Sequence, residues 1–211
     1  MKKIIKFFII IISIIIILYL INFFRNYLII NELLVKAKNF KISNNYELKQ
    51  TSLSTSVDNI SWEVLSEYYC KDNIYLYKNT TTLTKNLNKE TTTYGVWHNK
   101  NSNEHIEFIY DNNSLMKDEV IDKEKLELPP LSSLVFNNFS DLNYLKSIVL
   151  KENDVYKIQI FHKNYKSILY INSNTGIIES LNYIYNDSSY TLINSYEENI
   201  ITDEMIKKPN F

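Results

Sequence analysis

The sequence predicts an α+β chain that is mostly β, in which an N-terminal transmembrane helix precedes a curved antiparallel sheet with a few short helices. Three observations lead to this prediction. An apolar run of membrane-spanning length opens the chain, apolar and polar residues alternate with a period of two beyond it, and turn-forming residues separate the alternating segments. We therefore expect a transmembrane anchor at residues 1–25 and one extracytoplasmic β domain at residues 26–211.

The anchor begins with a short basic head that contains Lys2, Lys3 and Lys6. From Phe7 to Phe24 the chain is apolar apart from Ser13 and Asn22. Counted from Ile4, residues 4–24 are long enough at 1.5 Å per residue to cross about 30 Å of hydrocarbon. Because the lysines precede the apolar run, the N-terminus is expected inside the cell and the C-terminal domain outside the cytoplasm. A cleaved signal peptide is the alternative, but no small-x-small cleavage site follows the run. The favoured interpretation is a single-pass protein of the cell membrane.

Composition restricts the class of partner. Lys2, Lys3, Lys6 and Arg25 account for four of the 23 basic residues, so the outer domain has 19 basic residues against 24 acidic ones. This balance argues against nucleic acid as a partner, since phosphate binding requires a basic face. Cys70 is the only cysteine, so no intramolecular disulfide is possible. Abundant Ile, Asn, Lys and Tyr with only two glycines indicate an AT-rich genome. A low-GC Gram-positive bacterium is the first expectation, and mollicutes and parasitic protozoa are the alternatives.

Helical spacing continues directly after the anchor. Leu28, Leu33 and Ala37 recur on one side of residues 26–40, and this spacing predicts a helix that runs straight out of the membrane. The Ser43-Asn44-Asn45 sequence is expected to end it.

Beyond the helix, alternation predicts two groups of strands. The first group is expected at residues 46–53, 61–71, 74–82, 91–98, 105–111 and 115–121. The second group is expected at residues 144–151, 155–162, 167–172, 177–186 and 190–199. Between the groups, residues 122–143 contain Pro129-Pro130 and predict a linker with one short helix, which acts as a lid, a plug or a crossover. Gly176 is expected to take a positive φ in a tight turn, and residues 202–208 to form one helical turn.

Several of these strands carry apolar residues on both faces. In residues 61–70, Trp62, Val64 and Tyr68 lie on one face, while Leu65 and Tyr69 lie on the other. A sheet of this kind must be covered twice. Helices that cover the inner face of a strongly curved sheet would leave a groove.

The order of elements and several short stretches resemble the LolA-like fold, and most closely its extracytoplasmic clostridial members of the GerS type. The stretches that carry the resemblance are residues 33–34, 44–46, 156–160, 168–178 and 201–209. The best of them is the hairpin around Asn172-Ser-Asn-Thr-Gly176, which is similar to the family's strand–D/N-x-x-T-G–strand pair. The resemblance implies a half-open barrel without a catalytic centre, which binds a lipid, an acyl chain or a protein partner. The chain departs from the lipoprotein members because it has no lipobox, and a transmembrane helix takes the place of the lipid anchor.

The histidines and their neighbours are candidates for a metal site. His98 and His105 flank a predicted turn and lie near Glu104 and Glu107, so they could approach each other across a hairpin. The favoured interpretation is that both face solvent, and His162 is also expected to be exposed. No metal ligand and no cofactor are therefore assigned.

Catalytic signatures are weak in this sequence. Gly95 and Gly176 are the only glycines, and their separation excludes a Gly-x-Ser-x-Gly elbow and the usual glycine-rich phosphate loops. Glu63 and Glu67 are a possible carboxylate pair for a cell-wall hydrolase, but alternation predicts that they lie on a solvated face. We assign no catalytic residue and expect that the chain is not an enzyme.

Aromatic side chains are the remaining candidates for a binding site. Weak candidates for ligand binding are Trp62, Tyr68, Tyr94, Trp97 and Phe108. Their alternative role is to fill the core of a protein from an AT-rich genome. The sequence thus favours a non-enzymatic membrane-anchored module that engages a lipid, an acyl chain or an envelope protein. The alternatives are a structural subunit of an envelope or sporulation complex without a ligand groove, and a cell-wall hydrolase.

Overall fold

The structure, a computed structural model, describes residues 2–56, 60–85, 88–112, 114–120, 144 and 146–210. Within these ranges a long helix, α1 (Lys2–Asn39), precedes a sheet of eleven strands. The first group of strands is β1 (Asn45–Thr55), β2 (Ile60–Lys71), β3 (Ile74–Lys85), β4 (Asn88–Asn99), β5 (Glu104–Asp111) and β6 (Ser114–Val120). The second group is β7 (Ser147–Glu152), β8 (Val155–Phe161), β9 (Lys166–Asn172), β10 (Ile178–Ile184) and β11 (Ser189–Glu198).

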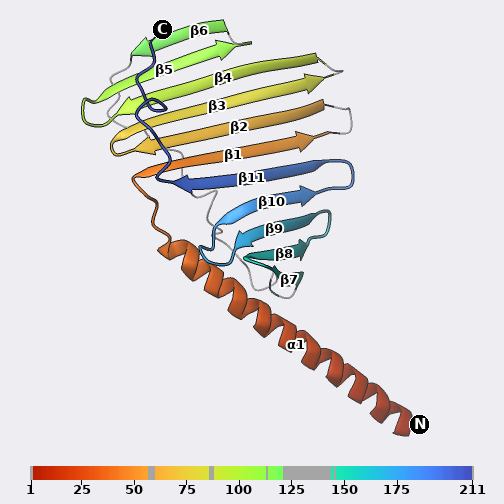
Figure 1. The fold of residues 1–211 in the computed structure, drawn as a ribbon. Coiled ribbons are helices and arrows are strands. Elements are labelled where there is room, and N and C mark those ends of the chain that lie inside the picture. Colours follow the sequence, from red (N-terminus) through yellow and green to blue (C-terminus); the bar gives the residue numbers. More distant parts are fainter. Residues whose placement is uncertain are drawn as a thin grey trace.

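All strands belong to one open antiparallel sheet with the order β6-β5-β4-β3-β2-β1-β11-β10-β9-β8-β7 (Figure 1). The first and last strands meet in the middle, where Tyr46 pairs with Glu198 and Thr55 pairs with Ser189. Two meanders therefore extend in opposite directions from the central β1–β11 pair. The predicted fold class, an apolar N-terminal helix followed by a curved, half-open antiparallel sheet, is confirmed. Each predicted strand has a counterpart with bounds that differ by a few residues, and the strand expected from residue 144 begins at Ser147.

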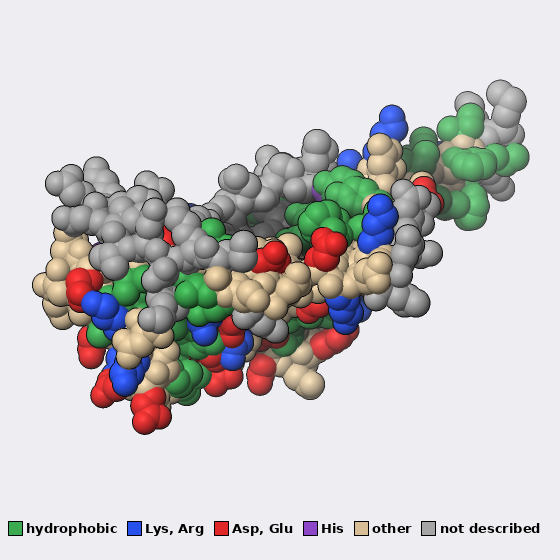
Figure 2. Space-filling model, turned by 90° about the horizontal axis from the view of Figure 1, so that it is seen from above, with side chains coloured by type: hydrophobic (Ala, Val, Ile, Leu, Met, Phe, Trp, Pro, Cys, Tyr) green, Lys and Arg blue, Asp and Glu red, His purple; other side chains and the backbone are tan. Residues whose placement is uncertain are grey.

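Helix α1 is continuous from the anchor into the domain, as the spacing predicts. It contains a segment long and apolar enough to cross a membrane, and the most apolar part of that segment makes no buried contact with the sheet. Figure 2 shows this apolar part of the helix projecting away from a domain whose surface mixes acidic and basic side chains. The one polar side chain near its middle, Ser13, donates its hydroxyl to the Ile9 carbonyl at 2.9 Å, so it adds no unpaired donor to the span.

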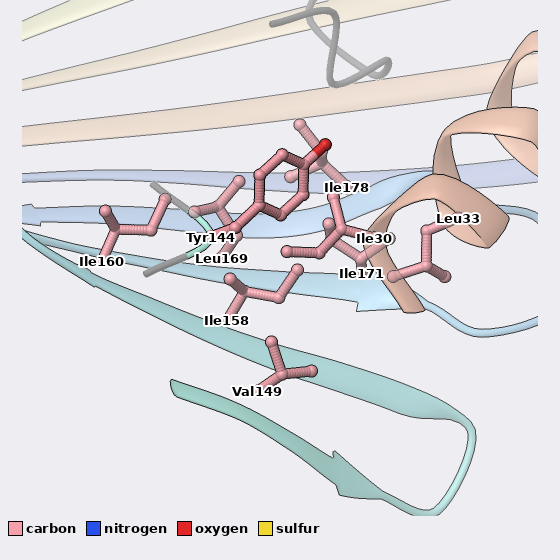
Figure 3. Packing of buried hydrophobic residues seen from close by; sticks show 9 residues of the cluster. All are labelled: Ile30, Leu33, Tyr144, Val149, Ile158, Ile160, Leu169, Ile171 and Ile178. Atoms are coloured by element: carbon pink, nitrogen blue, oxygen red, sulfur yellow. The ribbon is translucent and has the colours of Figure 1, made fainter. Parts of the chain in front are cut away.

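The second half of α1 packs on one face of the β7–β10 meander, here named the helix face. Ile30 and Leu33 of α1 are buried there against strand residues that point toward the helix (Figure 3). The buried residues of this cluster are Ile30, Leu33, Tyr144, Val149, Ile158, Ile160, Leu169, Ile171 and Ile178. Burial of this many branched side chains supplies the main apolar stabilisation of this half of the sheet.

The opposite face is covered at the other end of the sheet by the C-terminal segment, which crosses the strands of the first group in Figure 1. Ile201 and Ile206 of this segment are buried against Leu76, Trp97 and residues of β5. The Trp97 indole N–H donates to the Ile206 carbonyl at 2.9 Å. Each face of the sheet thus has a cover over part of its width among the described residues. Where the sequence predicts one helical turn, at residues 202–208, the structure has a single turn at residues 203–206. Thr202 Oγ1 accepts the Met205 N–H there at 3.4 Å.

Helix α1 also caps an edge of the sheet. Arg25 donates to the Val149 carbonyl at 3.2 Å, and the Asn26 amide donates to the carbonyls of Ser147 and Tyr144 at 3.0 and 3.1 Å. Two of these contacts, to Ser147 and Val149, use acceptors of edge strand β7, which would otherwise be available to another chain.

Gly176 brings the β9–β10 turn against α1. Its φ of 74° confirms the predicted positive φ, and a side chain at this position would collide with the backbone of Leu33 and Ala37. The segment at 122–143, for which the sequence predicts a linker with a short helix and a lid, plug or crossover role, lies outside the described residues.

Candidate ligand groove

A groove forms where the sheet parts between β10 and β11. Strand β11 pairs with β1 from Ser189 to Glu198, but β10 pairs with β11 only up to Ile193. On the other side, the β9–β10 register shifts between Ile178 and Ser180. Because a register shift bends the strand, the start of β10 moves away from the end of β11 and leaves an opening between them.

The opening has a volume of about 620 Å³. Its apolar walls are Phe40, Ile177, Ile178, Ile193 and Tyr196, which come from both faces of the sheet and from the segment after α1. This volume lies within the range of small-molecule pockets, about 300–1,000 Å³. The opening is therefore large enough to be considered as a ligand site.

Polar residues also line the groove, and the side chains of four of them, Asn172, Thr175, Glu179 and Asn194, form hydrogen bonds within the protein. The Asn194 amide donates to the Ile178 carbonyl at 2.7 Å and accepts from Gln50 at 3.1 Å, so it bridges the two separating strands. Glu179 accepts from the Asn172 amide at 2.9 Å. The Asn194–Ile178 bond ties β10 to β11 beside the opening.

Tyr196 contributes a neutral wall. Its hydroxyl accepts from the Ser43 N–H at 3.1 Å and donates to Glu198 at 2.8 Å. Burial is the main reason that the pKa of Tyr196 rises to about 12. The phenol thus stays uncharged at neutral pH, which suits contact with an apolar ligand.

The five aromatic residues predicted as ligand contacts are divided between the two faces. Trp62, Tyr68 and Tyr94 lie on the helix face, where Tyr68 stacks on Tyr77 at 4.7 Å and Tyr77 contacts Tyr94 at 6.4 Å between ring centroids. Trp62 and Tyr94 are 48% and 37% exposed, so this aromatic strip is partly open to a ligand.

The other two predicted residues are core residues of the opposite face. Trp97 and Phe108 are 3% and 4% exposed and pack under the C-terminal segment. The five residues therefore do not form one surface, and none of them lines the groove. Ligand contact by Trp62, Tyr68 and Tyr94 stays a prediction.

Sequence reasoning missed the residues that line the groove. A signal was present at Ile177-Ile178, where two isoleucines in succession break the alternation directly after Gly176. Such a break is typical of a β-bulge. Phe40, which lies between the helix and the first strand, gave no signal of this kind.

The expectation that His98 and His105 face solvent is wrong. They are directly paired across the β4–β5 hairpin, and they are only 6% and 1% exposed. His98 Nδ1 lies 3.1 Å from the Glu104 carbonyl, and His105 Nε2 lies 3.2 Å from a Glu107 carboxylate oxygen. His162, also expected to be exposed, is half-buried and stacks on Tyr165 at 4.1 Å.

The residues proposed for hydrolase chemistry do not meet. Strand register puts Glu63 and Glu67 on the face opposite to that of His98 and His105, so the sheet separates the carboxylates from the imidazoles. Glu67 accepts the Tyr69 hydroxyl at 2.7 Å. Among the described residues, no three metal-ligating side chains lie together. These four residues therefore cannot form a single hydrolytic centre.

The chain has only distant likeness to known proteins. No family model matches the chain, and no curated protein matches it. Among solved structures, a LolA superfamily protein from Nitrosomonas europaea is 8% identical with a TM-score of 0.28, and the match covers 84% of this chain and 97% of that protein. A DNA polymerase sliding clamp from Pseudomonas aeruginosa is 7% identical with a TM-score of 0.13, over 88% of this chain and 66% of that one. Because these TM-scores are low, the fold class rests on the sheet and helix of the chain itself.

Proposed function

We propose that the chain is a single-pass membrane protein whose residues 26–211 form an extracytoplasmic binding module for an acyl chain, without enzymatic activity. Residues 1–25 anchor it to the cell membrane. The observation that carries the proposal is the groove of about 620 Å³ between β10 and β11. Its apolar walls and neutral tyrosine fit a hydrocarbon chain, and its bridged strands hold it open without a ligand.

The position of the groove relative to the anchor supports this function. Phe40, a wall of the groove, follows the last residue of α1, and the proposed anchor ends at Arg25. Fourteen helical residues separate the two, which corresponds to about 21 Å along the helix axis. An acyl chain in the groove would therefore be held above the bilayer, which is the task of a carrier or sensor.

The sequence resemblance to LolA-like proteins supports the same class, because that resemblance implies binding of a lipid or an acyl chain. We extend it to a clostridial, GerS-type protein of a Gram-positive envelope as part of this proposal. In such a cell the anchor helix would attach the domain to the membrane, as a covalent lipid does in the lipoprotein members of the family.

Photolabelling of the full chain in its native membrane tests the groove. A photoreactive fatty acid should form adducts on peptides that cover residues 172–182 and 191–196. Ile193→Glu puts a charge in the groove and should remove most of these adducts. Leu53→Glu is the matched control, because Leu53 is 42% exposed on the same sheet face one strand away and does not line the groove. Adducts confined to residues 4–24 in the wild-type chain would contradict the proposal.

A structural or assembly role is the second candidate function. It is favoured by large apolar side chains on the face opposite α1, of which Ile184 is 44% and Leu53 is 42% exposed. A photoreactive amino acid at position 184 should then capture one protein reproducibly in cells. Failure to capture any protein, with intact groove labelling, would leave acyl-chain binding as the function.

A further inference from the structure

A second cavity lies beside the anchor, outside the groove described above. It is a notch of about 660 Å³ between α1 and the β7–β8 edge of the sheet. Leu18 and Tyr19 form its helix side, and Ile148 and Phe161 form its sheet side. Ile148 and Phe161 are 46% and 45% exposed, so two large apolar side chains lie open beside the anchor helix.

The contacts of α1 with β7 indicate the depth of this notch relative to the membrane. Arg25 bonds to the Val149 carbonyl and Asn26 to the Ser147 carbonyl, so β7 meets the helix where the proposed anchor ends. Leu18 lies seven residues before Arg25, which is about 10 Å nearer to the bilayer centre along the helix axis. Because Ile148 and Phe161 share a cavity with Leu18, they reach below the expected membrane boundary.

Basic side chains stand at the rim of the notch. Lys146 lines it, and the Lys166 ammonium lies over the Phe161 ring at 5.4 Å from the centroid. Lysines that flank apolar residues are typical of protein surfaces at the membrane interface, where the ammonium groups meet phosphate and the stems stay in contact with apolar groups. The arrangement provides an apolar floor for an acyl chain and cations for its head group.

We propose that the β7–β8 edge is immersed in the outer interface of the same bilayer and that the notch seats one phospholipid of that bilayer. The domain then has two points of attachment, the spanning helix and the edge of the sheet. This fixes its orientation, so the β10–β11 groove stays at a constant height above the lipid. The inference rests on the anchoring part of the proposed function and is independent of whether the groove binds an acyl chain.

Spin labels on the full chain in phosphatidylcholine–phosphatidylglycerol vesicles test the immersion. In a Cys70→Ala background, labels are placed by Ile148→Cys at the notch, Leu53→Cys as a control of similar exposure, and Ile12→Cys in the anchor. Collisions with oxygen report contact with hydrocarbon, and collisions with a water-soluble nickel chelate report contact with water. The label at position 148 should show an oxygen-to-nickel ratio several-fold above that at position 53.

The anchor label separates the possible failures. If position 12 is in hydrocarbon and position 148 is in water, the inference is overturned while the anchor stands. If position 12 is in water, the anchor and the inference both fail.

Lipid retention tests the seat without a change at Cys70. After detergent extraction, the wild-type chain and Leu53→Asp should retain phospholipid phosphate, and Phe161→Asp should lose it. Equal retention by Phe161→Asp and Leu53→Asp, or no phosphate in the wild-type chain, would overturn the lipid seat.

Discussion

In the β7–β10 half of the sheet α1 covers one face, whereas in the β3–β5 half the C-terminal segment covers the other face. Ile30 and Leu33 of α1 pack on the apolar residues of the β7–β10 half. Ile201 and Ile206 of the C-terminal segment pack on those of the β3–β5 half. Among the described residues, each half of the sheet is therefore stabilised by a local cover on one face.

The two covers also differ in what they are attached to. The cover of the β7–β10 half is the membrane anchor itself, while the cover of the β3–β5 half is a short segment held by Trp97 and two isoleucines. The half that borders the groove is thus fixed directly to the helix, because Ile178 belongs both to the helix-face cluster and to the groove wall. We expect the groove to depend on α1 and not on the C-terminal segment.

The largest expected effect comes from the core under α1. Ile171→Ala, at a residue that is 0% exposed, should lower the free energy of unfolding by about 2–5 kcal/mol, because it removes buried methyl groups and leaves a cavity. Ile184 lies on the same meander but is exposed, so Ile184→Ala should change the free energy of unfolding by less than about 0.5 kcal/mol. Chemical denaturation of the full chain in detergent micelles gives both values. Equal values would contradict the assignment of this core.

Gly176→Ala should weaken the contact between the β9–β10 turn and α1. The positive φ and the backbone of Leu33 and Ala37 leave no space for a side chain, so we expect a loss of about 1–3 kcal/mol. Hydrogen exchange should rise in α1 and β10 and stay unchanged in β4 and β5. A rise of equal size in both halves would mean that the two covers do not act independently.

Gly95→Ala tests the packing of the β3–β5 half of the sheet. A side chain at position 95 would collide with the Phe108 ring, and overpacking of this kind costs about 1–3 kcal/mol. The double variant Gly95→Ala with Phe108→Leu should be less destabilised than the sum of the two single changes. Strict additivity in a double-mutant cycle would rule out this contact as the reason for a glycine here.

The smallest expected effect is a dependence on pH from His98. Burial lowers the pKa of His98, and the nearby His105 and Lys100 act in the same direction against a hydrogen bond to the Glu104 carbonyl. The unfolded chain therefore binds more protons at this site than the folded chain does. The contribution of His98 to the free energy of unfolding is complete above about pH 6.5 and is lost as the pH falls through the folded-state pKa. His98→Gln should remove this part of the pH dependence. Stability that increases on acidification would contradict the sign.

Local patterns predict much of this fold, because alternation and turn residues are properties of short segments. They place the strands, the continuous helix and the positive φ of Gly176. They fail for His98 and His105, whose burial depends on what covers the end of a hairpin. They also fail to separate Trp97 and Phe108 from the aromatic strip, because strand register and the position of the C-terminal segment are set by contacts between distant parts of the chain.

The central claim is that the opening between β10 and β11 binds an acyl chain within the half of the sheet fixed to α1. Hydrogen exchange of the full chain in lipid nanodiscs, with and without a soluble fatty acid, tests it most directly. We expect added fatty acid to slow exchange at residues 176–182 and 191–196 in the wild-type chain and not in Ile193→Glu, with no change in β3–β5. Equal exchange with and without fatty acid at these residues would contradict the claim.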